Sequence, residues 1–492
     1  MLNINNKLAA CLDVAKKYEW LLDSYVLDFY VDDHWSKLPQ SWRHHLEDLP
    51  VKQLSDLLQH RETVVTARVS WPLELLALRQ VLRSLCIKRS PNKLIDVALP
   101  SCPLLEHRKL KHMFMKCVKP KKAHEIKRMA AICARSCQQT STMFVIDFGA
   151  GVGHLARVLG YGYGINVCCL EMQTALNEQA LAIDAKLESV ATKHLDASET
   201  THFKRPAHLT QRLSNDTTPE HFIESIRQAF QLSDTDFSFG IIGLHPCGDL
   251  SATLMRMFLS CKQAKFLNFV GCCYQKMSTQ STQPQMKLHG YPLSSQLQIA
   301  DNAQLSYEAR EIACHAMESY YDRLQVGDYE YLKIHSLRAA AERIIVQHLP
   351  DLRHSALRNV KHAPGMSFND YFQKATEGTQ FALIQAGSSD QIEADLLHWR
   401  RIVCFYTLRL MLAPLVESII LYDRELFLLE NGIYFCYLFC CDLFANILCL
   451  LSRLSSDHRI NFRSSHFTKK SYHQRHKELT WRKVAIEAHL KV

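Results

Sequence analysis

The residues with the clearest chemical potential lie in Val145–His154, where an apolar run is followed by an acid and three glycines at alternate positions. A backbone that passes close to a ligand tolerates no Cβ, and a tight turn needs conformations that glycine adopts at little cost. A helix that begins after the turn offers free N–H groups to an anionic ligand group. The segment therefore predicts a strand, a nucleotide-binding loop and a helix.

The spacing of the glycines separates two kinds of nucleotide site. A dinucleotide fingerprint has its third glycine three residues after the second, and His154 occupies that position here. The pattern Asp-x-Gly-x-Gly-x-Gly is instead typical of S-adenosylmethionine (SAM) sites, where no pyrophosphate is held and a carboxylate can face the methionine ammonium. We therefore expect Asp147, Gly149, Gly151 and Gly153 to bind SAM.

A second acid ends the next apolar run, Asn166–Glu171. An acid roughly 20 residues beyond the glycine loop commonly binds ribose hydroxyls. Glu171 is therefore predicted to complete the cofactor site. The alternative is a glycine turn in an unrelated α/β unit, with Glu171 as a solvated strand end.

Two later apolar runs end in polar clusters. Phe239–Leu244 is followed by His-Pro-Cys-Gly-Asp, and Ala264–Gly271 is followed by Cys-Cys-Tyr. Ligands of open parallel sheets bind beyond the carboxyl ends of the strands. Both clusters should therefore line the same crevice as Asp147 and Glu171.

These clusters supply candidate catalytic residues. His245 can act as a general base near neutral pH and is also expected to contact the cofactor. Tyr274 can stack on a base or hydrogen-bond the acceptor, and Asp249 is a third candidate, with a structural alternative as a helix N-cap. Cys247 has the position of a nucleophile, but Cys247, Cys272 and Cys273 are better explained as small thiols packed under the cofactor.

Several motifs together resemble the methyltransferase-like protein 25 family, whose members are also called ribosomal RNA adenine dimethylase domain-containing proteins. These motifs are the glycine loop, KKAHEI, GLHPCGDLS, NFVGCCYQKM, WSKLPQSW and LAPLVESIILYDRELFLLENG. The resemblance spans most of residues 20 to 432 and implies a class I, SAM-dependent methyltransferase. His-Pro-Cys-Gly and Cys-Cys are more distantly similar to a family of tRNA 2′-O-methyltransferases.

Basic residues gather directly before the first core strand. Residues 108 to 128 contain nine Lys/Arg and a single acid, Glu125. If Lys121, Lys122 and His124 border the crevice, they can bind phosphates in a salt-sensitive, sequence-independent way. Cys273 is a further candidate for substrate binding. The alternative for the basic run is a solvated helix face.

Composition places few further limits on function. Of the net charge of +9, only +2 comes from residues before 452, because the last 41 residues hold ten Lys/Arg against three Asp/Glu. The eighteen cysteines include no Cys-x2-Cys pair, so no metal is expected. A reducing, intracellular location in cytoplasm or nucleus is expected instead.

These motifs predict an α/β fold with a class I, Rossmann-like methyltransferase sheet. The chain divides into four segments. Apolar residues at helical spacing, such as Leu57 and Leu82, predict a helical N-terminal region over 1–115. The SAM-binding core occupies 116–294, a long helical insertion or cap 295–432, and a divergent basic tail 433–492.

The C-terminal segment departs from the family pattern. Where relatives are expected to add the antiparallel strand pair that closes the sheet, this chain reads Tyr-Phe-Cys-Tyr-Leu-Phe-Cys-Cys from residue 434. A membrane helix over 426–451 has sufficient length but contains costly polar residues. An alternative terminal exon is favoured, which predicts an unpaired sheet edge.

The sequence thus predicts a SAM-dependent methyltransferase that acts on RNA, either rRNA or tRNA, by direct methyl transfer. One alternative is a methyltransferase acting on a protein or a small molecule. Another is a noncatalytic module that retains the SAM fold to bind a partner.

Overall fold

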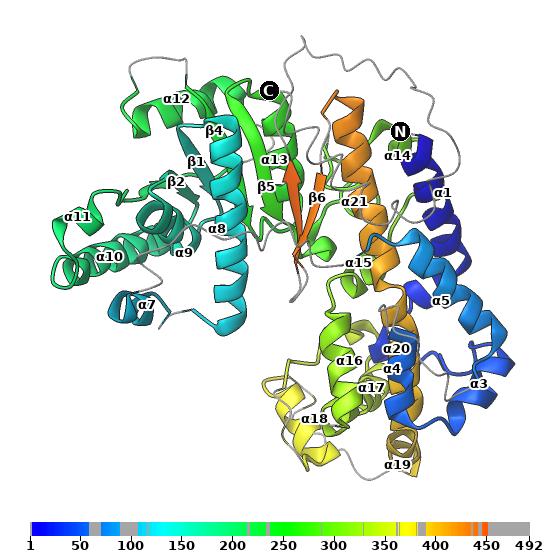
Figure 1. Cartoon of the computed structure of the whole chain (residues 1–492). Coiled ribbons are helices and arrows are strands. Elements are labelled where there is room, and N and C mark those ends of the chain that lie inside the picture. The colour runs from blue at the N-terminus through cyan, green and yellow to red at the C-terminus, as the bar shows by residue number, and fades with distance from the viewer. Residues whose placement is uncertain are drawn as a thin grey trace, which may run out of the picture. The chain divides into compact units, whose positions relative to one another are not determined.

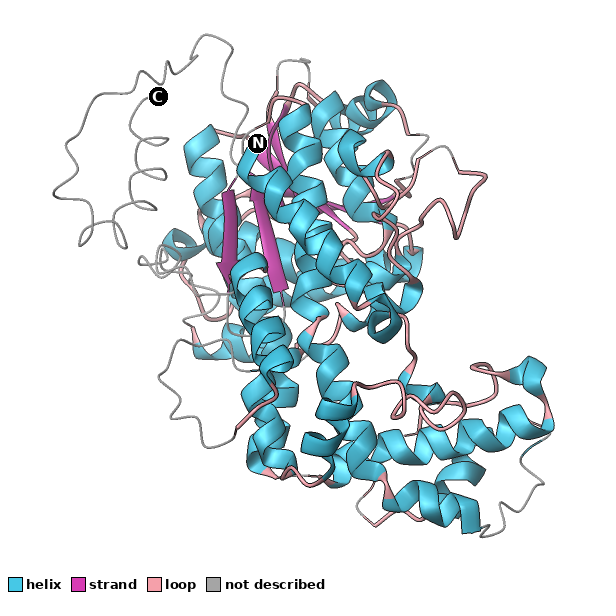
Figure 2. Cartoon of the chain, turned by 90° about the vertical axis from the view of Figure 1, so that its right-hand side faces the viewer, coloured by secondary structure: helices cyan, strands magenta, loops and turns pink. Residues whose placement is uncertain are grey.

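The computed structural model describes residues 2–58, 70–88, 107–115, 118–213, 217–232, 237–286, 288–327, 329–360, 363, 365–379, 381, 390–433, 436–440 and 445–450. Across these residues the strands belong to one sheet, and helices predominate elsewhere (Figure 2). The strand order is β3-β2-β1-β4-β5-β7-β6. The predicted Rossmann-like α/β class is confirmed.

Five parallel strands form the main part of the sheet, and four of them lie at apolar runs that the sequence analysis identified. They are β1 (Phe144–Phe148), β2 (Asn166–Glu171), β3 (Ala207–Thr210), β4 (Phe239–Leu244) and β5 (Ala264–Val270). All five residues of β1 are buried, as expected for a strand covered on both faces. Because β1 lies between β2 and β4, its end occupies the point where the strand order reverses.

Two antiparallel strands close the sheet beyond β5. These are β6 (Cys436–Cys440) and β7 (Ala445–Leu450), with β7 paired to β5 and β6 paired to β7. The prediction of an unpaired edge is therefore wrong. The alternative that was not favoured, a membrane helix over 426–451, is excluded because strands occupy 436–440 and 445–450. The apolar segment after residue 433 has lost the family's residue pattern, but its β-branched, aromatic and cysteine residues still suit strand pairing.

Helices cover both faces of the sheet (Figure 1). Side chains alternate between two cores, since Val145 of β1 packs on one face and Ile146 on the other. The helices around the sheet are α7 (Arg108–Met115), α8 (Pro120–Thr140), α9 (His154–Arg157), η3 (Val158–Gly162), α10 (Thr174–Ala191), α11 (Ala197–Thr200), α12 (Pro219–Ala229) and α13 (Asp249–Ser260). Helix α8 shares a core with β1, and α13 packs on the opposite face.

A second group of helices combines the N-terminal region with the segment between β5 and β6. From the N-terminal side come α1 (Leu2–Lys17), α2 (Glu19–Leu22), η1 (Val26–Asp28), α3 (Gln40–Glu47), η2 (Val51–Leu54), α4 (Ser55–Leu58) and α5 (Leu73–Leu85). From the C-terminal side come α14 (Ser295–Gln298), α15 (Tyr307–Ile312), α16 (Met317–Val326), α17 (Glu330–His348), η5 (Pro350–Leu352), α18 (Phe368–Thr376), α19 (Asp390–Leu397), α20 (Trp399–Met411) and α21 (Ala413–Glu430). Leu8 of α1 and Leu415 of α21 belong to the same buried cluster. The segments predicted as 1–115 and 295–432 thus contribute to one hydrophobic core.

Helix α5 lies in the region where apolar residues at helical spacing predicted helices. The predicted helix is present, but its buried face consists of Leu75, Leu78 and Leu82, while Leu73 is 80% exposed. Leu82, which the sequence prediction used, belongs to this buried face.

Helix α21 joins this helical core to the sheet. The Asp423 carboxylate accepts hydrogen bonds from the backbone N–H groups of Leu293 and Ser294 at 2.7 and 2.9 Å. Arg424 donates to Ser251 Oγ at 2.7 Å and lies over the Phe269 ring. The helical stretch Trp399–Glu430 is long and apolar enough to cross a membrane, but its most apolar window is completely buried, as in a core helix of a globular protein.

Candidate functional site

The loops after β1, β2, β4 and β5 meet at the carboxyl edge of the parallel sheet. In the loop after β1, Gly149, Gly151 and Gly153 all have positive φ, at 68°, 56° and 74°. A side chain at such positions strains the backbone. A Cβ at Gly151 would have no atom within 4 Å, so open space adjoins this glycine. The loop has the form that the sequence predicted.

Glu171 holds the glycine loop from the end of β2. One carboxylate oxygen accepts the N–H of Gly151 at 3.0 Å, and the other accepts the N–H of Gln173 at 3.1 Å. A carboxylate has about four acceptor sites, so each oxygen retains capacity for a ligand hydroxyl. Glu171 therefore orders the loop and can still bind ribose, which is a double role that the sequence did not reveal.

Asp147 is almost completely buried at the end of β1. Burial raises the pKa of its carboxyl to about 7, nearby Lys122 opposes this shift, and the negative charge of Glu171 adds to it. Burial and a nearby like charge both disfavour the ionised form of a carboxyl group, and a nearby positive charge favours that form. Asp147 and Glu171 thus fit a ligand that carries positive charge.

A buried ion cluster under the loop was not predicted. Asp184 of α10 accepts hydrogen bonds from Arg157 Nε at 2.5 Å and from His208 Nε2 at 2.8 Å. A Cβ at Gly153 would lie 3.0 Å from His208 Cε1, so the glycine permits this close packing. These residues come from three separate elements, and no local motif links them.

His245 lies at the carboxyl edge, as predicted, with an unusual backbone for a non-glycine residue at φ 73°. Its Nε2 lies 3.0 Å from a carboxylate oxygen of Glu125 in α8, and its Nδ1 lies 3.2 Å from Cys272 Sγ. Both ring nitrogens therefore have protein partners. Glu125 is a site residue that the sequence analysis did not assign, although it is the single acid in the basic run.

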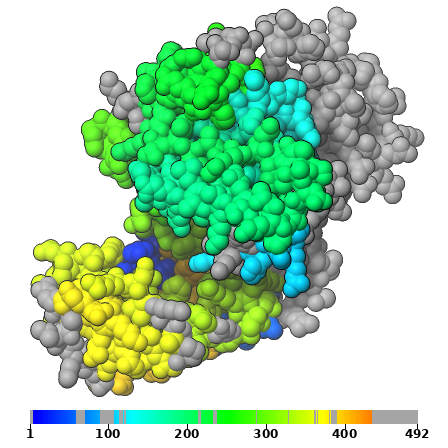
Figure 3. All heavy atoms as spheres, turned by 90° about the vertical axis from the view of Figure 1, so that its left-hand side faces the viewer, coloured from blue at the N-terminus to red at the C-terminus, as the bar shows by residue number. Residues whose placement is uncertain are grey.

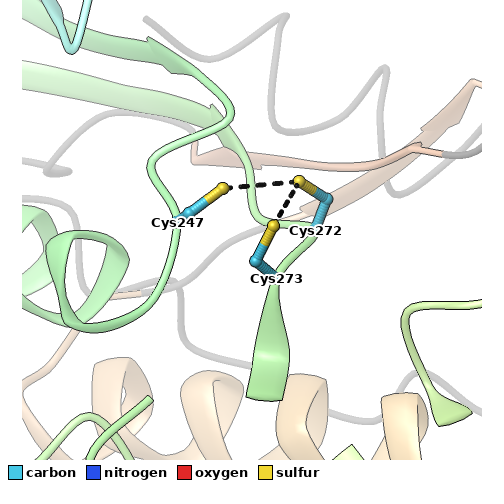
Figure 4. A group of neighbouring side chains, drawn as sticks. All are labelled: Cys247, Cys272 and Cys273. Carbon is cyan, nitrogen blue, oxygen red and sulfur yellow. Dashed lines mark hydrogen bonds between the residues drawn. The ribbon is translucent and has the colours of Figure 1, made fainter. Parts of the chain in front are cut away.

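Three half-buried thiols lie together beside His245 (Figure 4). Cys272 Sγ lies 3.6 Å from Cys247 Sγ and 3.5 Å from Cys273 Sγ. Hydrogen bonding from Cys272 lowers the pKa of Cys247 to about 6, against the effect of burial. The pKa of Cys272 is raised because it shares its proton with Cys247 and is partly buried. That these thiols pack under a cofactor stays a prediction, and the structure adds that the three sulfur atoms lie together.

The structure gives Tyr274 and Asp249 structural roles. Tyr274 is buried, and its hydroxyl donates to Glu417 of α21 at 3.0 Å. It therefore cannot stack on a base at the site, and the catalytic prediction for it is wrong. Asp249 is the first residue of α13 rather than its N-cap, and its carboxylate accepts the N–H of Ser278 at 2.7 Å. That bond holds a neighbouring loop, which gives Asp249 a structural role other than the N-cap, while its predicted catalytic role stays a prediction.

The predicted phosphate-binding residues lie at the first turns of α8. Lys122 is exposed, His124 is half-buried, and the side chain of Lys121 lies outside the described residues. Lys122 is close enough to Asp147 to affect its pKa, which places it near the cofactor loop. Figure 3 shows cyan atoms of this part of the chain at the surface beside green atoms. Lys109 Nζ of α7 lies 3.2 Å from Nε2 of His194, which follows α10.

A cavity of about 270 Å³ lies elsewhere, within the helical core. Its lining includes Tyr25, Glu311, His335 and Arg338. It contains none of the predicted site residues, so the carboxyl edge remains the candidate site.

The sheet order and the acids beside the glycine loop define the class of this chain, which contains a methyltransferase domain. Residues 121–280 match the family model described as "Methyltransferase domain". That match includes the glycine loop, Glu125, His245 and the three clustered thiols.

Relatives give a more particular resemblance. The chain is 27% identical over 203 residues to a Mus musculus protein called "Probable methyltransferase-like protein 25", covering 39% of this chain and 32% of the relative. The Homo sapiens protein of the same name is 27% identical over 202 residues, with the same shares. The resemblance to this family is confirmed, and the match spans about a third of each relative. No solved structure matches the chain.

Proposed function

We propose that this protein transfers a methyl group from SAM to RNA, with the donor bound at the carboxyl edge of the sheet. The observation that carries the proposal is the pairing of a positive-φ glycine loop with two acids, Asp147 and Glu171. The methyltransferase-domain match supports the reaction class. An RNA acceptor and an intracellular setting, in cytoplasm or nucleus, are parts of the same proposal.

The residues present fit SAM. The Asp147 carboxylate would face the methionine ammonium, and the free lone pairs of Glu171 would accept ribose hydroxyls. The open space beside Gly151 accommodates a ligand that a Cβ would obstruct. When bound, SAM supplies an electrophilic methyl group on a sulfonium.

Methyl transfer by direct displacement requires chiefly that the acceptor atom be positioned in line with that methyl group. The loops after β4 and β5 face the same edge, and the loop after β4 carries His245 and Cys247. Because both His245 nitrogens are occupied by Glu125 and Cys272, its proposed work as a base requires one of those contacts to open. An acceptor atom of low basicity would need His245 to remove its proton. An acceptor atom with a free lone pair would not need a base.

The first turns of α8 support an RNA acceptor. Lys119 and Lys122 are exposed there, and no acid occupies the first turn of this 21-residue helix. Cations at a helix N-terminus oppose the helix dipole, at about 0.3–1 kcal/mol each. Glu125, the single acid in the run, points inward to His245. Residues that helix stability does not favour are expected at positions where a function requires them. Phosphate binding is a function that would require lysines at this helix N-terminus.

The donor is tested by thermal unfolding with SAM and with its demethylated product, S-adenosylhomocysteine (SAH), for the wild type and Asp147→Ala. A ligand that binds only the folded state at 100 times its Kd adds about 2.7 kcal/mol. We expect a shift in the wild type that is lost in the variant. A well-folded wild type with no shift would contradict SAM binding and favour a noncatalytic module.

The acceptor is tested with labelled SAM and cell extract, with and without nuclease. Labelling that survives nuclease would indicate a protein or small-molecule acceptor. For purified RNA, Lys119→Glu with Lys122→Glu should weaken binding and reduce its dependence on salt. Lys262→Glu, an exposed lysine at the opposite edge of the sheet, is the matched control. SAH binding is measured on the same variants, because Lys122 also influences Asp147.

A further inference from the structure

We propose that Cys247, Cys272 and Cys273 bind a divalent metal ion of the zinc type at the carboxyl edge of the sheet, beside His245. Their three sulfur atoms all lie within 4.8 Å of one another (Figure 4). They come from two loops, the one after β4 and the one after β5. The proposal concerns these loops and does not rest on the identity of the methyl donor or acceptor.

The sulfur spacing agrees with thiolate coordination. A tetrahedral ion with metal–sulfur bonds of about 2.3 Å sets its sulfurs roughly 3.8 Å apart. The observed separations from Cys272 Sγ are 3.6 Å to Cys247 and 3.5 Å to Cys273. Small outward shifts would therefore give the geometry of a bound ion. Three protein ligands leave a fourth position for water or for a group on the acceptor.

His245 and Glu125 supply the outer support that such sites use. His245 Nε2 lies 3.0 Å from a Glu125 carboxylate oxygen, and His245 Nδ1 lies 3.2 Å from Cys272 Sγ. Metal binding displaces the thiol protons, and the imidazole would contact the Cys272 ligand from outside the set of sulfurs. Outer partners of this kind commonly change metal affinity by about 10–100-fold.

The two loops are held firmly against each other. The N–H of His245 donates to Val270 O at 3.1 Å. Gly248 has φ 61°, and a Cβ there would lie 2.8 Å from Lys276 O, so glycine permits the close approach. On the other side of the thiols, Tyr274 is anchored to Glu417. The sulfurs are thus brought together by packing.

The test is the metal content of the full-length protein, purified under reducing conditions and exposed to Zn²⁺. We expect about one zinc per chain in the wild type, and loss of it in Cys247→Ser and Cys272→Ser. Cys314→Ser is the matched control, because Cys314 is also half-buried and contacts Tyr274 and Gln275 outside the trio. Glu125→Gln should retain the site with weaker affinity. Circular dichroism and the SAH-dependent thermal shift show whether each variant is folded.

Cobalt provides a readout that needs no variant. Co²⁺ added to metal-free wild type should give thiolate-to-cobalt charge-transfer absorption and the strong visible bands of a tetrahedral ion. Absence of both bands together with substoichiometric zinc would overturn the proposal. A disulfide within the trio in reduced, metal-free preparations, or equal loss of zinc in Cys314→Ser, would overturn it as well. SAH binding is read separately, so failure of the metal site is distinguishable from failure of the donor site.

Discussion

Asp147 is the residue where function and stability conflict most directly. A carboxylate at the end of a buried strand is costly when ionised, and burial raises its pKa from 3.8 to about 7. The same charge is what a cationic ligand requires. A residue that weakens the empty fold at neutral pH is expected at a binding site rather than in a purely structural position.

Asp147→Asn should therefore stabilise the ligand-free protein at pH 8. The folded-state pKa lies above the unfolded one, so the wild type binds more protons when folded and loses stability as pH rises from about 4 to about 7. The variant should lack this loss, with a difference of up to a few kcal/mol that is constant above pH 7. Chemical denaturation across pH measures it. Equal pH profiles for both proteins would contradict the raised pKa.

SAH affinity should fall on acidification below about pH 7. Protonation of Asp147 removes the charge that faces the ligand ammonium, so the loss approaches tenfold per pH unit below the pKa. Calorimetric titration at several pH values tests this. Methylthioadenosine, which lacks the amino-acid group, is the control ligand and should bind with little pH dependence. A parallel decline for both ligands would show that another group titrates.

Gly151→Ala separates binding from folding. The positive φ costs the variant about 1–2 kcal/mol, but its Cβ meets no atom within 4 Å. The methyl group instead occupies space proposed for SAM, so SAH affinity should fall at least about tenfold, worth 1.4 kcal/mol. Gly365→Ala is a matched control, since Gly365 has φ 72° and an equally open Cβ position outside the site. If both variants bind SAH alike, Gly151 does not border the ligand.

The sequence predicted the residues whose roles depend on local pattern. Asp147 and Glu171 end adjacent strands, and strand periodicity locates both. Tyr274 was misassigned because its partner, Glu417, is 143 positions away. Glu125 was unassigned for the same reason, since His245 is 120 positions distant. The thiol site escaped a search for Cys-x2-Cys pairs because its ligands come from two loops joined only by the fold.

At the scale of elements, the segment after β5 connects the sheet to α21. Its loop carries Cys272 and Cys273, and the next residue, Tyr274, is buried against α21. Asp423 and Arg424 of the same helix bind the loop near Leu293 and the start of α13. Movement of α21 would therefore displace the loop that carries Cys272 and Cys273.

Tyr274→Phe should destabilise the protein by about 1–3 kcal/mol, because it removes a buried hydrogen bond to a carboxylate. Under conditions where the variant is folded, kcat for methyl transfer should remain within a few-fold of the wild type. A double-mutant cycle with Glu417→Gln should give a coupling energy of about 0.5–3 kcal/mol. Loss of kcat in a stable, folded variant would restore the catalytic role that the sequence suggested.

The closing strands show what motif comparison misses at this scale. Residues 436–440 and 445–450 pair with β5 and with each other, although their sequence departs from the expected family pattern. Strand pairing is satisfied by backbone groups, and many apolar sequences can supply it. Motif loss is therefore weak evidence for loss of a strand.

At the scale of the molecule, the N-terminal helices and the helices that follow the loop after β5 build one helical core. Leu8 and Leu12 of α1 share a cluster with Leu415 and Ile419 of α21. The sequence predicted helices at both ends but gave no means to pair them, because helical periodicity identifies an apolar face without identifying its partner. Through α21, this core is coupled to the loops of the methyltransferase site.

Leu8→Ala tests that coupling from a position outside the site. Leu8 is fully buried, and a leucine-to-alanine change in a core costs about 2–5 kcal/mol. Since α1 packs on α21, and α21 binds the loops beside the sheet, we expect the variant to lower the same unfolding transition that SAH raises. Leu73→Ala, at a site 80% exposed, should leave it unchanged. If SAH shifts a transition that Leu8→Ala does not move, the helical core and the sheet unfold independently, and α21 transmits no stability to the site.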